Sequence, residues 1–265
     1  MPALHEAPWC RRDQPVFSAL TSEEGWRQVV CYTPSIVAVD GGYRMWYLGC
    51  SDQTREGVMA VGLAESEDGV DWDVYPEPLY RSTRGPCVRE TDGGYEMWAC
   101  SAPDPDDPTR NEGRSDIVQY IYRFESPDGI EWIREDDPAV TTGGRVDSVV
   151  YPEVVETAEG YVMFYASHLV NGDEFEMHCA TSPDGREWTT HHDVSSFPAT
   201  RHPDDFDGRY TSTPCVLDCG DRYRLYYSAR DWGTLYGAGD GTVKVDSHGI
   251  YRHVGVADLA KSWLE

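Results

Sequence analysis

The chain has 265 residues, enough to bury a sizeable hydrophobic core, and 40% of its residues are hydrophobic. Its formal net charge of −25 argues against binding to nucleic acid or to anionic membranes, because both would repel an acidic protein. No apolar run approaches the ~20 residues that a membrane-spanning helix needs. We therefore expect one acidic domain, residues 1–265, without nucleic-acid or membrane partners.

The N-terminal residues and the cysteines indicate the compartment. Residues 1–9 lack the basic and apolar regions of a signal peptide. The eight cysteines include no CxxC pair, so neither a zinc ribbon nor a thioredoxin-type motif is indicated. A disulfide framework is not expected in a cytosolic chain of this size. These observations predict a cytoplasmic protein whose thiols are mostly small core residues.

A cassette recurs four times along the chain, and its first half is a proline followed nine residues later by a tyrosine. One expected strand follows the proline, and the tyrosine begins a second strand that is rich in aromatic residues. The four pairs are Pro34 and Tyr43, Pro86 and Tyr95, Pro152 and Tyr161, and Pro214 and Tyr223. The prolines are 52, 66 and 62 residues apart, and such a period is typical of a ring or an array.

The second half of the cassette reads Ser-x-Asp-Gly-x-x-Trp. It occurs at Ser66–Trp72, Ser126–Trp132 and Ser182–Trp188, and a degenerate copy spans Ala257–Trp263. Asp-Gly favours a turn, because glycine accepts a positive φ and the aspartate side chain can bond its own backbone. We interpret this motif as structural and expect its tryptophan to pack between neighbouring repeats.

Each cassette predicts four strands. In the first cassette they are 35–40, 43–48, 58–65 and 74–80. Four such units predict an all-β protein, a β-propeller with four repeats. The last repeat ends at Trp263 with almost no strand after it, and residues 9–17 resemble residues 133–140, which follow Trp132. We therefore expect residues 9–17 to form the outer strand of the last blade and to close the ring.

The pattern Pro-x-Val-x(5)-Gly-Tyr-x-Met-Trp-Tyr, followed by Ser-x-Asp-Gly-x-x-Trp, resembles the β-propellers of glycoside hydrolase families 43 and 32 over nearly the whole chain. The resemblance implies five blades, whereas four cassettes can be counted, so both numbers stay open. It also implies a catalytic Asp immediately before a cassette proline and a Glu as general acid. The residues before the prolines are Thr33, Gly85, Tyr151 and Thr213, so that Asp is not matched.

Strand alternation suggests which side chains line the axis. The residues after the four prolines are expected to share the face of the positions before them: Ser35, Cys87, Glu153 and Cys215. Glu153 is the only carboxylate among them, and we interpret it as a general acid or base, with a solvated or Arg84-paired glutamate as the alternative. Asp147 and Asp207 precede the third and fourth inner strands and are candidate second carboxylates.

Other residues are candidates for binding a substrate. Tyr32, Arg84 and Tyr151 precede or adjoin the cassette prolines. His168 and Arg230 lie seven residues after their cassette tyrosines, and Asp231 and Trp232 follow Arg230 directly. Such a run suits a hydroxylated or anionic ligand. Cys87, Cys215 and Glu153 could ligate a soft metal such as zinc, but we expect no cofactor and interpret the cysteines as small residues in a narrow channel.

These residues predict a carbohydrate-active, glycosidase-like enzyme that acts on a polyhydroxylated small molecule in the central funnel by acid/base catalysis. One alternative is a non-hydrolytic isomerase, cyclase or lyase, which needs only one well-placed carboxylate. Another is a sugar-binding propeller without catalytic activity. The fold alone cannot choose among these functions, and nothing in the sequence predicts the oligomeric state.

Overall fold

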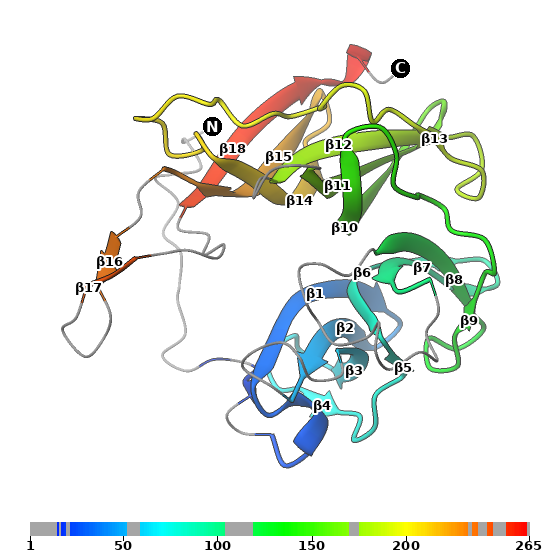
Figure 1. Ribbon diagram of the computed structural model, residues 1–265. Helices are drawn as coiled ribbons and strands as arrows, with labels where there is room; N and C mark the ends of the chain where they lie inside the picture. Colours follow the sequence, from blue (N-terminus) through cyan, green and yellow to red (C-terminus); the bar gives the residue numbers. More distant parts are fainter. Residues whose placement is uncertain are drawn as a thin grey trace.

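The computed structural model describes residues 15, 17–19, 22–51, 59–103, 119–169, 175–232, 235–237, 243–245 and 253–263. Their strands form four antiparallel sheets that follow one another along the chain, with one additional small hairpin (Figure 1). The helical elements in these ranges are two single turns, η3 (Gly25–Arg27) and η4 (Lys261–Trp263). None of them is long and apolar enough to span a bilayer. The expected all-β fold and the count of four blades are confirmed.

Each blade is a meander in which strands that are consecutive in the chain pair with one another. The first blade contains β1 (Val30–Val39), β2 (Gly42–Cys50), β3 (Ala60–Ser66), β4 (Asp73–Val74) and β5 (Tyr80–Arg81). The second contains β6 (Thr83–Thr91), β7 (Gly94–Ser101), β8 (Tyr120–Ser126) and β9 (Ile133–Arg134). The third contains β10 (Val146–Thr157), β11 (Gly160–Leu169), β12 (Phe175–Ser182) and β13 (Thr189–Thr190). The fourth contains β14 (Tyr210–Asp218), β15 (Arg222–Arg230) and β18 (His253–Ala260), and the hairpin β16 (Leu235–Gly237) and β17 (Val243–Val245) lies between its last two strands in sequence.

The hydrophobic core lies between blades. Trp46 and Leu63 of the first blade pack against Met97 and Phe124 of the second, and all four side chains are fully buried. A second cluster joins the second blade to the third. Alternate residues of each strand therefore face different neighbours, and both faces are apolar, so each blade depends on the next for burial of its core.

Tryptophans join consecutive blades in the same way at two junctions. Trp46 Nε1 donates to the carbonyl of Gly129 at 2.9 Å, and its ring lies edge-on to Trp132 with centroids 6.2 Å apart. Trp98 Nε1 donates to the carbonyl of Gly185 at 3.3 Å, and its ring lies 6.2 Å from that of Trp188. Both glycines belong to Ser-x-Asp-Gly turns, and their positive φ allows the close approach. The structural interpretation of this motif is confirmed.

The cassette prolines interrupt the inner strands and do not begin them, which differs from the expected strand starts. In β1 the pairing shifts between Tyr32 and Ser35, and equivalent shifts occur in β6, β10 and β14. Proline has no N–H to donate, so the strand forms a bulge there. The residue before each proline has a positive φ: Thr33 49°, Gly85 62°, Tyr151 56° and Thr213 46°. For the three residues that are not glycine, this conformation costs about 1–3 kcal/mol each.

Two other expectations concern the outer strands. The expected strand 74–80 is divided into β4 and β5, because Pro76 and Pro78 interrupt the pairing. The closing strand expected at residues 9–17 lies outside the described residues, apart from Pro15 and Phe17. Phe17 packs against Tyr47 of the first blade, with ring centroids 4.6 Å apart.

The strained position before each proline predicts opposite effects for two exchanges. Gly85→Thr should lower the free energy of unfolding by about 1–3 kcal/mol, because a β-branched residue resists positive φ. Its Cβ would also lie only 3.1 Å from Tyr151 Cδ1. Thr33→Gly should be neutral or stabilising by up to about 1 kcal/mol, because glycine adopts this conformation without strain. Urea denaturation of both variants measures this, and equal losses of stability would contradict it.

Candidate functional site

The residues after the cassette prolines lie at the blade junctions. At three junctions this side chain accepts a hydrogen bond from a backbone N–H of the following blade. The bonds are Val88 N to Ser35 Oγ (2.9 Å), Val154 N to Cys87 Sγ (3.4 Å) and Val216 N to Glu153 Oε1 (3.1 Å). Glu153 therefore occupies the same structural place as a serine and a cysteine in the other blades.

Glu153 differs from its counterparts because it titrates. Burial raises the pKa of Glu153 to about 7, although the Val216 N–H and the Cys87 thiol act in the opposite direction. Arg84 is not its partner, since Arg84 Nε donates to Gln119 Oε1 at 2.6 Å. The strand position predicted for Glu153 assumed regular alternation, but the bulge before Glu153 breaks that alternation. Glu153 is therefore a half-buried carboxyl that can gain or lose a proton near neutral pH.

Both cysteines of the suggested metal site are within electrostatic reach of Glu153. Burial, followed by the charge of Glu153, raises the pKa of the buried Cys87 thiol, and the same two causes raise the pKa of Cys215 although that residue is exposed. A thiol with a raised pKa is a poor metal ligand, since the thiolate is the ligand form. Within the part of the chain that the structure describes, no three His, Cys, Asp or Glu side chains are grouped to hold a metal ion.

Tyr32, Arg84 and Tyr151 lie together. Burial lowers the pKa of Arg84, but Tyr151, Cys100 and Tyr32 outweigh this effect and raise it overall. The backbone N–H of Tyr151 donates to Cys100 Sγ at 3.3 Å. Gln119, which holds the guanidinium of Arg84, was missed in the sequence because it belongs to no repeat position.

A second cluster joins the third and fourth blades. His168 Nδ1 and Asp147 Oδ1 are 2.9 Å apart, and the ring of Phe175 lies 5.0 Å from that of His168. Phe175 is also 5.8 Å from the ring of Tyr210, and the guanidinium of Arg230 lies 5.0 Å from the same tyrosine. Arg230 is fully buried. Phe175 and Tyr210 were not expected, although each is the strand partner of a predicted residue, His168 and Arg230.

The remaining predicted residues make contacts of their own within the fourth blade. Asp207 is buried, and its carboxylate accepts a hydrogen bond from the Tyr227 hydroxyl at 2.8 Å. Asp231 Oδ2 lies 3.1 Å from His253 Nε2. Trp232 is 41% exposed, and the guanidinium of Arg209 lies 5.7 Å from its ring. Asp207 is therefore engaged in packing, whereas Trp232 is available to a ligand.

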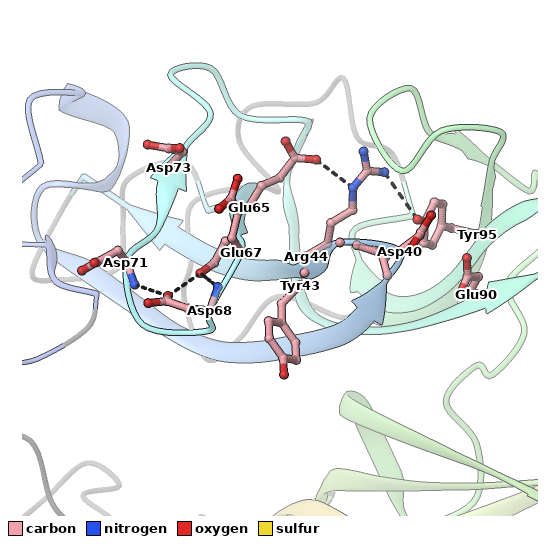
Figure 2. A pocket seen from close by; sticks show the side chains of 14 residues that line it. Asp40, Tyr43, Arg44, Glu65, Glu67, Asp68, Asp71, Asp73, Glu90 and Tyr95 are labelled. Atoms are coloured by element: carbon pink, nitrogen blue, oxygen red, sulfur yellow. Dashed lines mark hydrogen bonds and ion pairs between the residues drawn. The ribbon is translucent and has the colours of Figure 1, made fainter.

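A large open hollow lies elsewhere, over the turns of the first blade and the start of the second. Its volume is about 790 Å³, and acidic side chains dominate its lining (Figure 2). Arg44 crosses it, with Nε 2.8 Å from Glu65 Oε1 and Nη1 3.5 Å from the hydroxyl of Tyr95 (Figure 2). None of the predicted site residues lines this hollow.

Sequence comparison gives two relatives of unknown activity. No protein-family model matches the chain. It is 30% identical over 178 residues to the uncharacterized proteins Rv1502 and MT1551 from two strains of Mycobacterium tuberculosis. Each match covers 63% of this chain and 56% of the relative, so the chain spans just over half the length of the curated relatives it matches.

Structural comparison is more informative. A thermostable family-43 glycoside hydrolase superposes with a TM-score of 0.63 at 16% identity, covering 90% of this chain and 81% of the hydrolase. A second glycoside hydrolase gives 0.60 at 15% identity, with coverages of 84% and 64%. Xylan beta-1,4-xylosidase from Bacillus halodurans C-125 gives 0.58 at 14% identity, with coverages of 90% and 47%. The chain has a β-propeller fold of the glycoside hydrolase family 43 type.

Proposed function

We propose that the protein is an enzyme that acts on a carbohydrate, or on a similarly polyhydroxylated small molecule, with Glu153 as its acid/base. The observation that carries this proposal is a half-buried carboxyl with a pKa of about 7 on the inner strand of a blade. A group with that pKa is present in both protonation states near neutral pH, which suits proton transfer to or from a substrate hydroxyl. The strained backbone at Tyr151 lies two residues away, and such strain gathers at functional sites.

The structural neighbours support a sugar-like substrate. Those compared above are named as glycoside hydrolases or as a xylosidase, and another neighbour of similar fold is described as an RGII complex. These descriptions belong to the neighbours, and the low identity transfers only the fold. They nevertheless raise the expectation that a ring of this shape holds a sugar.

The side chains near the inner strands offer suitable binding groups. The guanidinium of Arg84 and the phenols of Tyr32 and Tyr151 can donate hydrogen bonds to hydroxyl oxygens. Trp232, which is 41% exposed, presents an aromatic ring on which a sugar ring can lie. Arg230 is fully buried against Tyr210, so its charge can act on a ligand only from beneath the surface.

Hydrolysis would require a second carboxylate about 5–10 Å from Glu153. Neither predicted aspartate meets this requirement well, because the carboxylate of Asp207 is buried against Tyr227 and Asp147 lies six residues before Glu153 on the same strand, a span of about 20 Å when extended. The side chain of Asp147 is 43% exposed and can therefore reach a water molecule or a substrate.

The contact between Asp147 and His168 favours a second function, a lyase or an isomerase. An ionised Asp147 can only accept, so His168 Nδ1 donates to it and Nε2 is left as the basic nitrogen. A carboxylate that orients an imidazole is a common arrangement for a general base. In such an enzyme His168 would remove a proton from carbon, and Glu153 would protonate or deprotonate oxygen.

A panel of 4-nitrophenyl glycosides and uronic-acid oligosaccharides, with products identified by NMR, tests both functions. Glu153→Gln should lower turnover by ~10²–10⁴, because glutamine keeps the shape of glutamate and cannot exchange a proton. Glu156→Gln is the matched control, since Glu156 lies on the same strand but is exposed and paired with Arg89. A free reducing sugar indicates hydrolysis, an unsaturated sugar a lyase, and a product of unchanged mass an isomerase.

Three results would contradict the proposal. They are no turnover of any substrate in the panel, full activity of folded Glu153→Gln, and an equal loss in Glu156→Gln.

The raised pKa of Glu153 also predicts a dependence of stability on pH. A carboxyl with a raised folded-state pKa contributes stability below its unfolded value of about 4.5 and loses that contribution as the pH rises to about 7. Glu153→Gln cannot titrate, so its stability relative to the wild type should be greater at pH 8 than at pH 5, by about 1.4 kcal/mol per unit of pKa shift. Urea denaturation of both proteins at the two pH values isolates Glu153, because all other groups are shared. A difference that does not change with pH would show that the pKa is not raised.

A further inference from the structure

The half-buried side chain of Arg84 lies where the inner strands of three blades meet. Arg84 is on β6, and β6 contacts both β1 and β10 (Figure 1). The phenols of Tyr32 on β1 and of Tyr151 on β10 interact electrostatically with its guanidinium. A Cβ built on the neighbouring Gly85 would lie 3.1 Å from Tyr151 Cδ1. The guanidinium is therefore placed between blades and not inside one blade.

The groups that hold Arg84 are neutral. Arg84 Nε donates to the amide oxygen of Gln119 at 2.6 Å, and Arg84 Nη1 lies 3.7 Å from the thioether sulfur of Met59. The thiol of Cys100 is also within hydrogen-bonding reach. Because sulfur is a weak acceptor, Gln119 is the one strong acceptor that the described residues offer this side chain.

Arg84 also lacks an ion pair with any carboxylate of the described residues, although the chain contains 47 acidic residues. The buried residues Arg27 and Arg123 differ, since they pair with Glu24 at 2.6 Å and with Glu96 at 2.9 Å. Removing a cation from water is costly, and neutral contacts return only part of that cost. The surroundings of Arg84 are therefore short of one negative charge.

The carboxyl of Glu153 does not supply that charge. Burial, the Val216 N–H and the Cys87 thiol set the pKa of Glu153, and Arg84 makes no contribution to it. Tyr151, which lies against the residue next to Arg84, is two residues before Glu153, a span of about 7 Å along an extended strand. A ligand of the size of a sugar ring with its substituents can therefore contact both groups.

We propose that the substrate carries a carboxylate, as a uronic acid does, and that Arg84 is the residue that selects it. This inference rests on the function proposed above and names its substrate class. Gln119 engages Nε, so the carboxylate would accept two parallel hydrogen bonds from Nη1 and Nη2, a geometry that the planar guanidinium matches. One cation balances a carboxylate, whereas a phosphate would bring up to two negative charges into an already acidic protein.

Binding of matched sugar pairs tests this assignment. The probes are the methyl glycosides of glucuronic, galacturonic and mannuronic acid, each compared with the neutral glucoside, galactoside or mannoside by calorimetry. Glu153→Gln is the host protein, and NMR verifies that the probes are not consumed. At least one uronide should bind about tenfold or more tightly than its neutral partner, because a hydrogen bond to a charged group contributes enough for a change of that size.

Substitutions at Arg84 in the same host test the residue itself. Arg84→Gln should bring the affinity ratio of the selected pair close to one, because glutamine is neutral. Arg84→Lys should keep part of the preference, because lysine retains the charge without the planar fork. Arg89→Gln is the matched control, since Arg89 lies on the same strand but is paired with Glu156, and it should leave the ratio unchanged. Thermal melts followed by circular dichroism show that each variant is folded.

Five results would overturn the proposal. They are equal affinities within all three pairs, no binding of any probe, an unchanged ratio in folded Arg84→Gln, an equal loss in Arg89→Gln, and tighter binding of glucose 6-phosphate than of the glucuronide. If Arg84→Gln does not fold, the comparison of the sugar pairs and the Arg84→Lys variant still decide.

This proposal and the proposed function fail separately. Turnover of neutral glycosides by the wild type without a preference for uronides would keep the acid/base role of Glu153 and overturn the carboxylate site. A uronide preference that depends on Arg84, without turnover of any uronide, would support the carboxylate site and contradict the enzyme.

Discussion

One contact repeated between neighbouring blades holds this structure together. The inner strand of each blade is a sheet edge, and the bulge at the cassette proline adds a break in its pairing. A backbone N–H two residues after the proline finds its acceptor in the preceding blade, at Ser35, Cys87 or Glu153. A buried N–H without an acceptor is costly, so this bond, together with the tryptophan contacts, sets the spacing of the blades.

The same contact explains why a titrating group can lie at a blade junction. The position requires only an acceptor, and a hydroxyl, a thiol and a carboxylate all meet that need. Glu153 meets it with an oxygen that can also carry a proton, and burial at the junction raises its pKa to about 7. A structural bond and a candidate catalytic group are therefore combined in one side chain. The strained residue Tyr151 and the neighbouring Arg84 add polar groups without disturbing that bond.

The repeat pattern predicted the fold well, because blade identity depends on residues that are close in sequence. The proline–tyrosine spacing located the paired strands, and the Asp-Gly turn with its tryptophan located the contacts between blades. The bulges were not foreseen, because they arise from cross-strand pairing around a single proline. Alternation across Pro152, on which the predicted position of Glu153 rested, is interrupted by such a bulge.

The candidate site was predicted in part. Asp147 and His168, and separately Arg84 and Tyr151, were proposed as individual residues, and the structure brings each pair together. Gln119, Phe175 and Tyr210 were missed because their roles depend on the pairing of distant strands. Asp207 could not be separated from Asp147 by sequence, since only packing against Tyr227 shows that its carboxylate is engaged.

The measurement that tests this account most directly is a titration of the Glu153 carboxyl carbon by ¹³C NMR, assigned by the loss of its signal in Glu153→Gln. The account predicts a midpoint near 7, set by burial at the junction with Val216. A midpoint near 4.5, the ordinary value of the group, would show that Glu153 is a solvated carboxylate and would contradict its role as the acid/base.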